Sequence, residues 1–172
     1  FMTSEIPTNL RACGDYVYMD MYAMHSFGGT MRYVISEDRM EQPNPDWKST
    51  YGFVTPQRLY TVFPSFNGDT MEPLPIFVTV FDSATGAWLE EECFETDIVA
   101  ELSDKLISFP YKDMVVIGTE DRVTFYGLGA ENYGKKLGEI FFESGERVKV
   151  YNFEKVLDFK VQDDVLYRIC TP

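Results

Sequence analysis

The side chains of this 172-residue chain that are suited to chemistry are few, and its single histidine, His25, is the first of them. No Gly-x-Ser-x-Gly elbow and no cysteine-nucleophile motif accompanies it. The spacing leaves a pair with Cys13, Cys93 or Cys170 open, but nothing in the sequence requires such a pair. We therefore assign His25 a structural or surface role, and we predict that the chain has no catalytic residue.

Clustered thioethers next to His25 raise the question of a soft metal ion such as Cu(I). The cluster is Met19-x-Met21-x-x-Met24-His25. On a strand, successive side chains alternate between faces, so Met19 and Met21 would share one face while Met24 points to the other. Two thioethers on one face are typical of core filling. The sequence also contains no zinc or calcium motif, and we predict neither a metal nor a cofactor.

Carboxylates form three short clusters, at Glu90–Glu92, Glu120-Asp121 and Asp163-Asp164. A glycosidase needs two carboxylates facing each other across the scissile bond, one of them acting as acid and the other as base or nucleophile. The clusters here fall at turns or on an edge strand, where solvated acidic side chains are normal. A carboxylate-dependent glycan hydrolase on a β scaffold therefore stays an alternative function.

Charge and composition limit the classes of partner. The chain carries a formal charge of −13, with 45% hydrophobic and 16% aromatic residues, which is typical of a folded domain. Because phosphate backbones and anionic lipid surfaces are bound by Lys and Arg, we expect neither nucleic acid nor membrane as a partner. An acidic face for a basic protein remains open. The three widely spaced cysteines favour an intracellular location.

The elements that would position these residues are short β-type runs separated by turn residues. We predict one helix, Thr96–Lys105, and loops at the proline-rich segments Pro43–Pro45 and Pro73–Pro75. The predicted strands are Tyr16–Met24, Met31–Ser36, Leu59–Phe63, Ile76–Asp82, Leu106–Phe109, Met114–Gly118, Val123–Gly127, Leu137–Phe142, Val148–Phe153, Val156–Val161 and Val165–Ile169.

Two segments have the same spacing of Val, Thr, paired aromatics and a closing aromatic: Val78–Trp88 and Val123–Tyr133. A looser copy starts at Met31 and ends at Trp47, and Leu106–Gly118 is similar to Val156–Ile169. Intervals in the forties with several strands per unit predict propeller-like repeats of antiparallel sheets. The expected repeat units are 10–50, 58–95, 105–143 and 147–172, within a single β domain spanning residues 1–172.

The pattern aromatic-Asp-x-x-Thr-x-x-Trp at Phe81, Asp82, Thr85 and Trp88 resembles the turn between the third and fourth strands of a kelch repeat. The resemblance implies that Asp82 and Thr85 hold the turn and that Trp88 is buried between neighbouring sheets. It also implies a protein-interaction role, because many such propellers recruit proteins through their loops. In the second copy Tyr126 and Tyr133 stand for Phe81 and Trp88, whereas Gly127 and Ala130 replace the Asp and the Thr.

The chain length corresponds to three or four such units, and a single-chain propeller needs at least four to close. Since the chain starts with Phe1-Met2, we expect an incomplete ring, completed by further blades outside this sequence. An antiparallel β-sandwich or barrel is the alternative fold.

The predicted function is a non-catalytic protein-interaction module or a subunit of a larger assembly. A structural coat component is a third possibility. Loop aromatics are the expected contacts to a protein partner, since aromatic side chains at loops are favoured binding anchors. The candidate binding residues are Phe66, Tyr111 and Tyr133.

Overall fold

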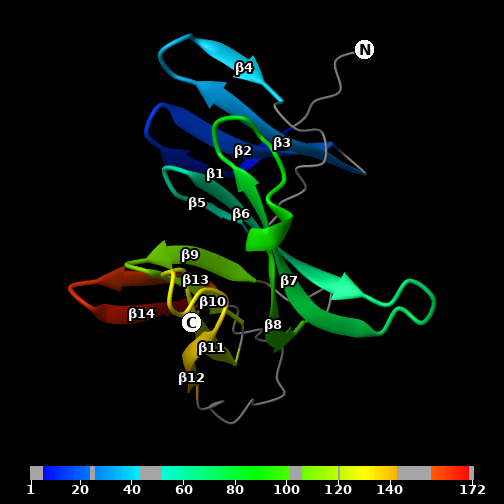
Figure 1. Cartoon of the computed structure of the whole chain (residues 1–172), viewed down its shortest axis with the longest axis vertical. Helices are drawn as coiled ribbons and strands as arrows, with labels where there is room; N and C mark the ends of the chain where they lie inside the picture. The colour runs from blue at the N-terminus through cyan, green and yellow to red at the C-terminus, as the bar shows by residue number, and fades with distance from the viewer. Residues whose placement is uncertain are drawn as a thin grey trace. The chain divides into compact units, whose positions relative to one another are not determined.

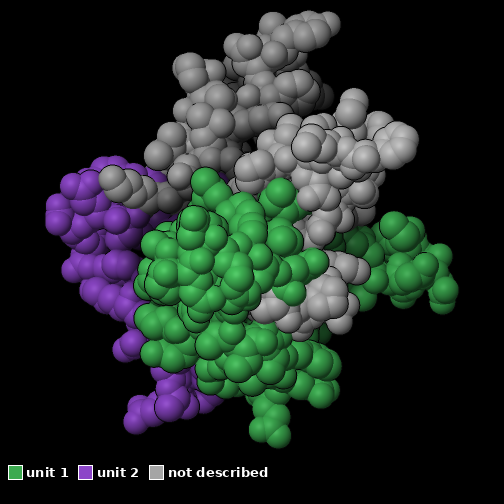
Figure 2. Space-filling view, turned by 90° about the horizontal axis from the view of Figure 1, so that it is seen from above, with its two compact units in different colours: residues 1–99 green, residues 100–172 purple. Residues whose placement is uncertain are grey.

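The computed structural model describes residues 6–23, 26–42, 52–100, 106–119, 121–142 and 156–170. This part of the chain is all-β and every strand pairs antiparallel with its neighbours (Figure 1). Its one helical element is a 3-10 turn, η1, at Glu90–Glu92. None of the described elements is a helix with the length and apolarity needed to cross a membrane. The chain forms two compact units, residues 1–99 and residues 100–172 (Figure 2), and each is described below by itself.

The first unit contains two four-stranded sheets in which each strand pairs with the next one along the chain. The first sheet consists of β1 (Ile6–Cys13), β2 (Tyr16–Ala23), β3 (Ser26–Val34) and β4 (Arg39–Glu41). The second consists of β5 (Phe53–Val54), β6 (Arg58–Phe66), β7 (Pro73–Asp82) and β8 (Phe94–Val99).

The second unit contains a third four-stranded sheet of the same strand order and a two-stranded sheet. The third sheet consists of β9 (Ile107–Tyr111), β10 (Met114–Gly118), β11 (Arg122–Gly127) and β12 (Lys136–Phe141). The two-stranded sheet consists of β13 (Val156–Gln162) and β14 (Val165–Cys170).

One backbone hydrogen bond recurs in the three four-stranded sheets. The residue that follows the third strand donates its N–H to a carbonyl in the turn between the first two strands of its own sheet. The three bonds are Ile35 N to Asp15 O at 2.9 Å, Ser83 N to Gln57 O at 3.1 Å, and Leu128 N to Asp113 O at 2.8 Å. The same local geometry is therefore built three times from unlike residues.

Two of the first hairpins, β1–β2 and β9–β10, turn tightly, and left-handed residues make that possible. Gly14 (φ +58°) lies in the β1–β2 turn, and Lys112 (φ +52°) lies in the β9–β10 turn. In the two-stranded sheet Asp163 and Asp164 have φ values of +51° and +61°. Two-residue turns with positive φ match the right-handed twist of the strands that they join, and Gly, Asn and Asp favour them.

The core of the first unit lies between its two sheets. Tyr18 of the first sheet packs on Leu59 and Phe81 of the second, with Tyr16 and Val54 partly buried against them. On the opposite face of the second sheet the side chains of Val62, Ile76, Val78, Val80 and Ile98 are fully buried. The second sheet is thus apolar on both faces, in contrast to a sheet with one solvated side.

The helix predicted at Thr96–Lys105 is wrong where the structure describes it, because strand β8 covers Phe94–Val99. Burial alternates along β8: Thr96 and Ile98 are buried, whereas Glu95, Asp97 and Val99 are exposed. This two-residue period is that of a half-buried strand. Residues 101–105 lie outside the described part.

The loop predicted at Pro73–Pro75 is also wrong, since both prolines belong to β7. Pro73 is the first residue of the strand, and the register shifts between Pro75 and Phe77. A strand start and a bulge are the positions where a sheet tolerates a residue without an N–H. Pro7 similarly lies in β1, at the edge of the first sheet, which the sequence did not predict as a strand.

Most predicted strands coincide with observed ones within a few residues, and Met114–Gly118 coincides with β10 at both ends. Strands β1, β4, β5 and β8 were not predicted. Several predictions lie outside the described residues: those for Met24, His25, Pro43–Pro45, Trp47 and Val148–Phe153.

Candidate functional site

The Asp82–Thr85 turn at the end of β7 is held by a single carboxylate oxygen. Asp82 Oδ1 accepts hydrogen bonds from Ala84 N at 3.1 Å, from Thr85 N at 2.8 Å and from Thr85 Oγ1 at 2.8 Å. The turn closes at Gly86, whose φ of +75° favours glycine. The N–H of Thr85, and then its hydroxyl, hold the pKa of Asp82 below its ordinary value.

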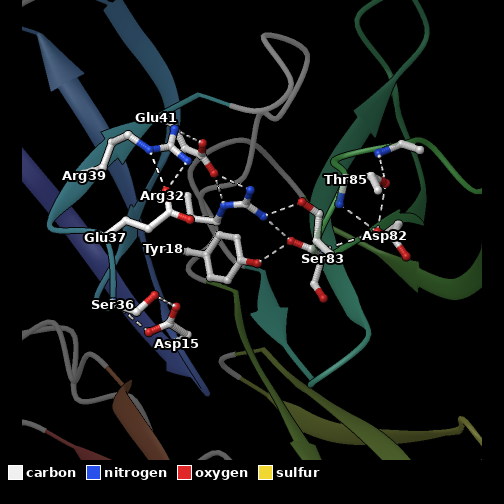
Figure 3. A network of polar contacts seen from close by, with 12 residues as sticks. Asp15, Tyr18, Arg32, Ser36, Glu37, Arg39, Glu41, Asp82, Ser83 and Thr85 are labelled. Atoms are coloured by element: carbon white, nitrogen blue, oxygen red, sulfur yellow. Dashed lines mark hydrogen bonds and ion pairs between the residues drawn. The ribbon is translucent and has the colours of Figure 1, made fainter.

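The carbonyl groups of this turn are bound by the first sheet (Figure 3). Arg32 Nη1 donates to Ser83 O, and to Ala84 O at 2.9 Å. Tyr18 Oη donates to the same Ser83 oxygen at 2.8 Å. The Asp82 side chain accepts from the N–H groups of Ala84 and Thr85, whereas the carbonyls of Ser83 and Ala84 accept from the first sheet. Two side chains of the first sheet therefore hold the chain at the point where it leaves β7, the third strand of the second sheet.

Strand pairing places the side chains of this contact in one row. Tyr18 of β2 lies opposite Arg32 of β3, which lies opposite Glu41 of β4. Arg32 Nε donates to Glu41 Oε1 at 2.7 Å, Nη2 donates to the same oxygen, and the guanidinium carbon lies 4.4 Å from the centroid of the Tyr16 ring. We call Tyr16, Tyr18, Arg32 and Glu41, with the carbonyls of Ser83 and Ala84, the Arg32 network.

The electrostatics of the Arg32 network follow from its burial. Arg32 is only 6% exposed, and a buried guanidinium is stable only when it is paired and hydrogen-bonded. Its hydrogen bonds hold the pKa of the Glu41 carboxyl below the usual range, while burial raises the pKa of the Tyr18 hydroxyl. Both groups are thus kept in their ordinary states at neutral pH, Glu41 ionised and Tyr18 neutral. That arrangement suits structure and gives no group poised for proton transfer.

A second arginine supports the other side of the same turn. Arg58 donates to Glu92 of η1 from Nε at 2.6 Å and from Nη2 at 2.7 Å, and its Nη1 lies 3.7 Å from Asp82 Oδ2. A bidentate pair of this kind fixes geometry as well as charge. It attaches the segment that follows the turn to the start of β6. The carboxylates of Asp82 and Glu92 are therefore engaged with arginine.

The predicted repeat residues have unlike surroundings. Phe81 and Tyr126 are buried as the third-strand aromatics of their sheets, and Asp82 and Thr85 hold the turn between them. Trp88 pairs with Phe81 but is 54% exposed. The burial expected for Trp88 is therefore wrong for the structure described. Its Nε1 donates to Cys93 Sγ at 3.3 Å.

The equivalence of Tyr133 and Trp88 is also wrong, because the second turn is three residues longer. Asp82 N donates to the carbonyl of Ala87, five residues on, whereas Gly127 N donates to that of Lys135, eight residues on. Strand pairing accordingly places Lys136 opposite Tyr126, where Trp88 lies opposite Phe81. Tyr133 instead forms a parallel bridge with Gly127.

The candidate binding aromatics are divided between the two units. Phe66 ends β6 in the first unit and is half-buried. Tyr111 and Tyr133 belong to the second unit; Tyr111 packs against the buried Val116 and Val123. The hydroxyl of Tyr111 is buried without a hydrogen-bond partner among the described residues. Tyr111 is therefore a core residue of its sheet more than a surface anchor.

Sequence reasoning missed the Arg32 network. Its one signal was the sequence Met31-Arg32-Tyr33-Val34, a basic residue within a predicted strand of a chain that has only 15 Lys and Arg. No group of three or more His, Cys, Asp or Glu that would suit a metal occurs in the part of the chain that the structure describes. Comparison with known proteins finds no match for this chain, either among family models, among curated proteins or among solved structures.

Proposed function

We propose that the chain is a non-catalytic protein-interaction module, or a subunit of a larger assembly, built on an incomplete β-propeller-like scaffold. The observation that carries the proposal is the backbone hydrogen bond that recurs after the third strand of three consecutive four-stranded sheets. Propeller blades are four-stranded antiparallel sheets of this strand order, repeated along the chain. Three sequences that differ form the same backbone hydrogen bond where the third strand ends. This shared geometry indicates a repeated unit.

The Arg32 network supports the same proposal. In a propeller each sheet must pack face to face on the next, and here Tyr18 packs on Leu59 and Phe81 while Arg32 holds the Asp82–Thr85 turn. The acceptors of this contact are backbone carbonyls, which any sequence offers. Free thiols at Cys13 and Cys93 favour a reducing, intracellular location.

From an incomplete scaffold we expect that the chain associates with other chains. An incomplete ring leaves one sheet face and one strand edge without a neighbour, and such surfaces recruit other chains. Sedimentation velocity of residues 1–172 at micromolar concentration should show species heavier than the monomer, with a proportion that rises with concentration. A compact monomer at every concentration would mean that the fold closes by itself, and the incomplete propeller would then be abandoned.

A further inference from the structure

The second sheet has one stretch of apolar surface that its own unit leaves exposed. Phe63 of β6 lies directly opposite Phe77 of β7, and Phe77 lies opposite Glu95 of β8. Directly opposed residues share a face, and along β8 the exposed residues Asp97 and Val99 follow Glu95 on that face. We call Phe63, Phe77, Glu95, Asp97 and Val99 the Phe63–Phe77 face.

The two phenylalanines are unusually open for paired aromatics, with 44% of Phe63 and 41% of Phe77 exposed. On the same strands Leu59 and Phe81 are covered by Tyr18, four residues before Phe63 and four after Phe77. The cover provided by the first sheet therefore stops short of the Phe63–Phe77 pair. Beyond that point β6 and β7 continue as a long hairpin (Figure 1).

The stretch of sequence that carries this face is acidic. Residues 59–100 contain eight Asp and Glu and neither a Lys nor an Arg. The nearest arginine before them, Arg58, is engaged with Glu92 and lies near Asp82. Glu95, in contrast, forms no ion pair with any residue that the structure describes. An exposed aromatic pair next to the Glu95 carboxylate has the anatomy of an interface, with an apolar centre and a polar rim.

We propose that the Phe63–Phe77 face docks a segment of a protein partner in which Arg or Lys alternates with apolar side chains. The apolar side chains would cover the two rings. A guanidinium beside them can lie over a ring face and also reach the Glu95 carboxylate, which are both favourable contacts for Arg. The inference rests on the proposed interaction role, but it does not depend on the propeller-like scaffold.

A matched set of peptides tests the chemistry. The probe is a fluorescein-labelled nine-residue peptide of alternating Arg and Leu, and binding to the full chain is followed by fluorescence anisotropy. One control peptide replaces every Arg by Glu, and the other replaces every Leu by Ser. We expect saturable binding of the Arg–Leu peptide, at least about tenfold tighter than either control, since tenfold corresponds to roughly 1.4 kcal/mol. No saturation up to millimolar peptide, or equal binding of the Arg–Ser peptide, overturns the proposal.

Variants locate the binding. Phe77→Thr keeps a β-forming residue and removes the ring, and Glu95→Lys reverses the rim charge. Each substitution should lower the affinity for the Arg–Leu peptide by about tenfold, as truncation of an interface anchor does. Glu91→Lys is the matched control, because Glu91 is exposed on η1 and gives the same change in net charge. Equal weakening by Glu91→Lys and Glu95→Lys would mean unspecific attraction and would overturn the proposal.

Two further measurements keep the outcomes distinct. Far-ultraviolet circular dichroism checks each variant, and Phe63→Thr replaces Phe77→Thr should the latter fail to fold. If Phe77→Thr abolishes self-association in sedimentation, the occupant is a second copy of this chain, and the basic-partner proposal falls. If the chain stays monomeric but binds the peptide at this face, the incomplete scaffold fails and the docking proposal stands.

Discussion

Two turns at the end of a third strand, Asp82–Thr85 in the first unit and 127–135 in the second, solve the same geometric problem with different atoms. In the first, one oxygen of Asp82 satisfies three donors within the turn. In the second, Gly127 has no side chain, and the position that a Cβ would occupy lies 2.4 Å from Asn132 O and 2.5 Å from Asn132 Oδ1. The longer loop fills the space that the aspartate fills in the shorter one.

The difference explains why the sequence pattern is incomplete in the second copy. An aspartate at 127 would collide with Asn132, so the longer loop and the loss of the Asp go together. Both turns still begin with the same backbone hydrogen bond, from Ser83 N in one case and from Leu128 N in the other. The backbone hydrogen bond at the end of the third strand is therefore the common feature. The atoms that fill the turn after it differ between the two units.

The largest expected effect is loss of the arginine that holds the first turn. Arg32→Ala should lower the free energy of unfolding by about 3 kcal/mol, the lower part of the range for breaking a buried ion pair, since Glu41 keeps some solvent contact. Urea unfolding followed by tryptophan fluorescence measures it. Arg39→Ala is the matched control: this arginine also pairs with Glu41 but is exposed, so its loss should lower the free energy of unfolding much less than the loss of Arg32. Equal losses would mean that the Arg32 network does not hold the turn.

Next in size is the effect of a methyl group in the second turn. Gly127→Ala should cost about 2 kcal/mol, because the new Cβ meets backbone and side-chain atoms of Asn132 and overpacking of this kind strains the loop. Gly138→Ala in β12 is the control, since a Cβ there meets nothing within 4 Å. Alanine in a strand interior should then be neutral or slightly stabilising. If both variants had the same stability, the space at Gly127 would not be what distinguishes the two turns.

The carboxylate of the first turn should contribute less. Asp82→Ala should cost about 1–2 kcal/mol through the loss of hydrogen bonds to a charged acceptor. Thr85→Val keeps the Thr85 N–H as a donor, so it should cost less than Asp82→Ala. If Thr85→Val lowered the free energy of unfolding as much as Asp82→Ala, the Thr85 hydroxyl would be the group that stabilises the turn.

The same carboxylate predicts a pH dependence. The pKa of Asp82 is lower in the folded chain than its ordinary value of 3.8. A lowered pKa gives stability that is fully present above the ordinary value and is lost as the pH falls through the folded value. The wild-type chain should therefore be more stable to unfolding than Asp82→Asn at neutral pH, and this difference in stability should disappear below about pH 4. A stability difference that does not change with pH across this range would mean that the ionised form of Asp82 is not what stabilises the turn.

The part of the site that could be predicted from sequence is the local part. Asp82 and Thr85 lie three residues apart, and short polar side chains at this spacing close turns whatever surrounds them. Arg32 reaches Ser83 across 51 residues, and no local pattern encodes that partner. Tyr133 was aligned with Trp88 because spacing alone does not reveal that a turn has gained three residues.

The all-β class and most strands were predictable for the same reason, and the strand predictions failed where pairing with distant residues decides. Alternating Val, Thr and aromatic residues fixed most strands, since their period is two. β8 was misread because Ile98, Val99 and Leu102 also suit one helix face, and only pairing with β7 decides between the two. β1 was missed because Pro7 and Asn9 suggest a loop, and an edge strand with a bulge accommodates both.

The smallest expected effect concerns Trp88, which follows the first turn and was expected to be buried. A buried tryptophan costs about 3–5 kcal/mol on truncation to alanine. With 54% of its surface exposed, Trp88→Ala should cost only about 1 kcal/mol, in proportion to the apolar area that remains covered. Trp88→Phe keeps a ring and removes the Nε1 donor to Cys93 Sγ, so the difference between the two variants separates apolar cover from the hydrogen bond. Urea unfolding measures both variants. A loss of 3 kcal/mol or more for Trp88→Ala would mean that the indole is covered in solution by chain outside the described residues or by a second molecule. The closing aromatic of the first turn would then be a packing residue, as the repeat pattern predicted.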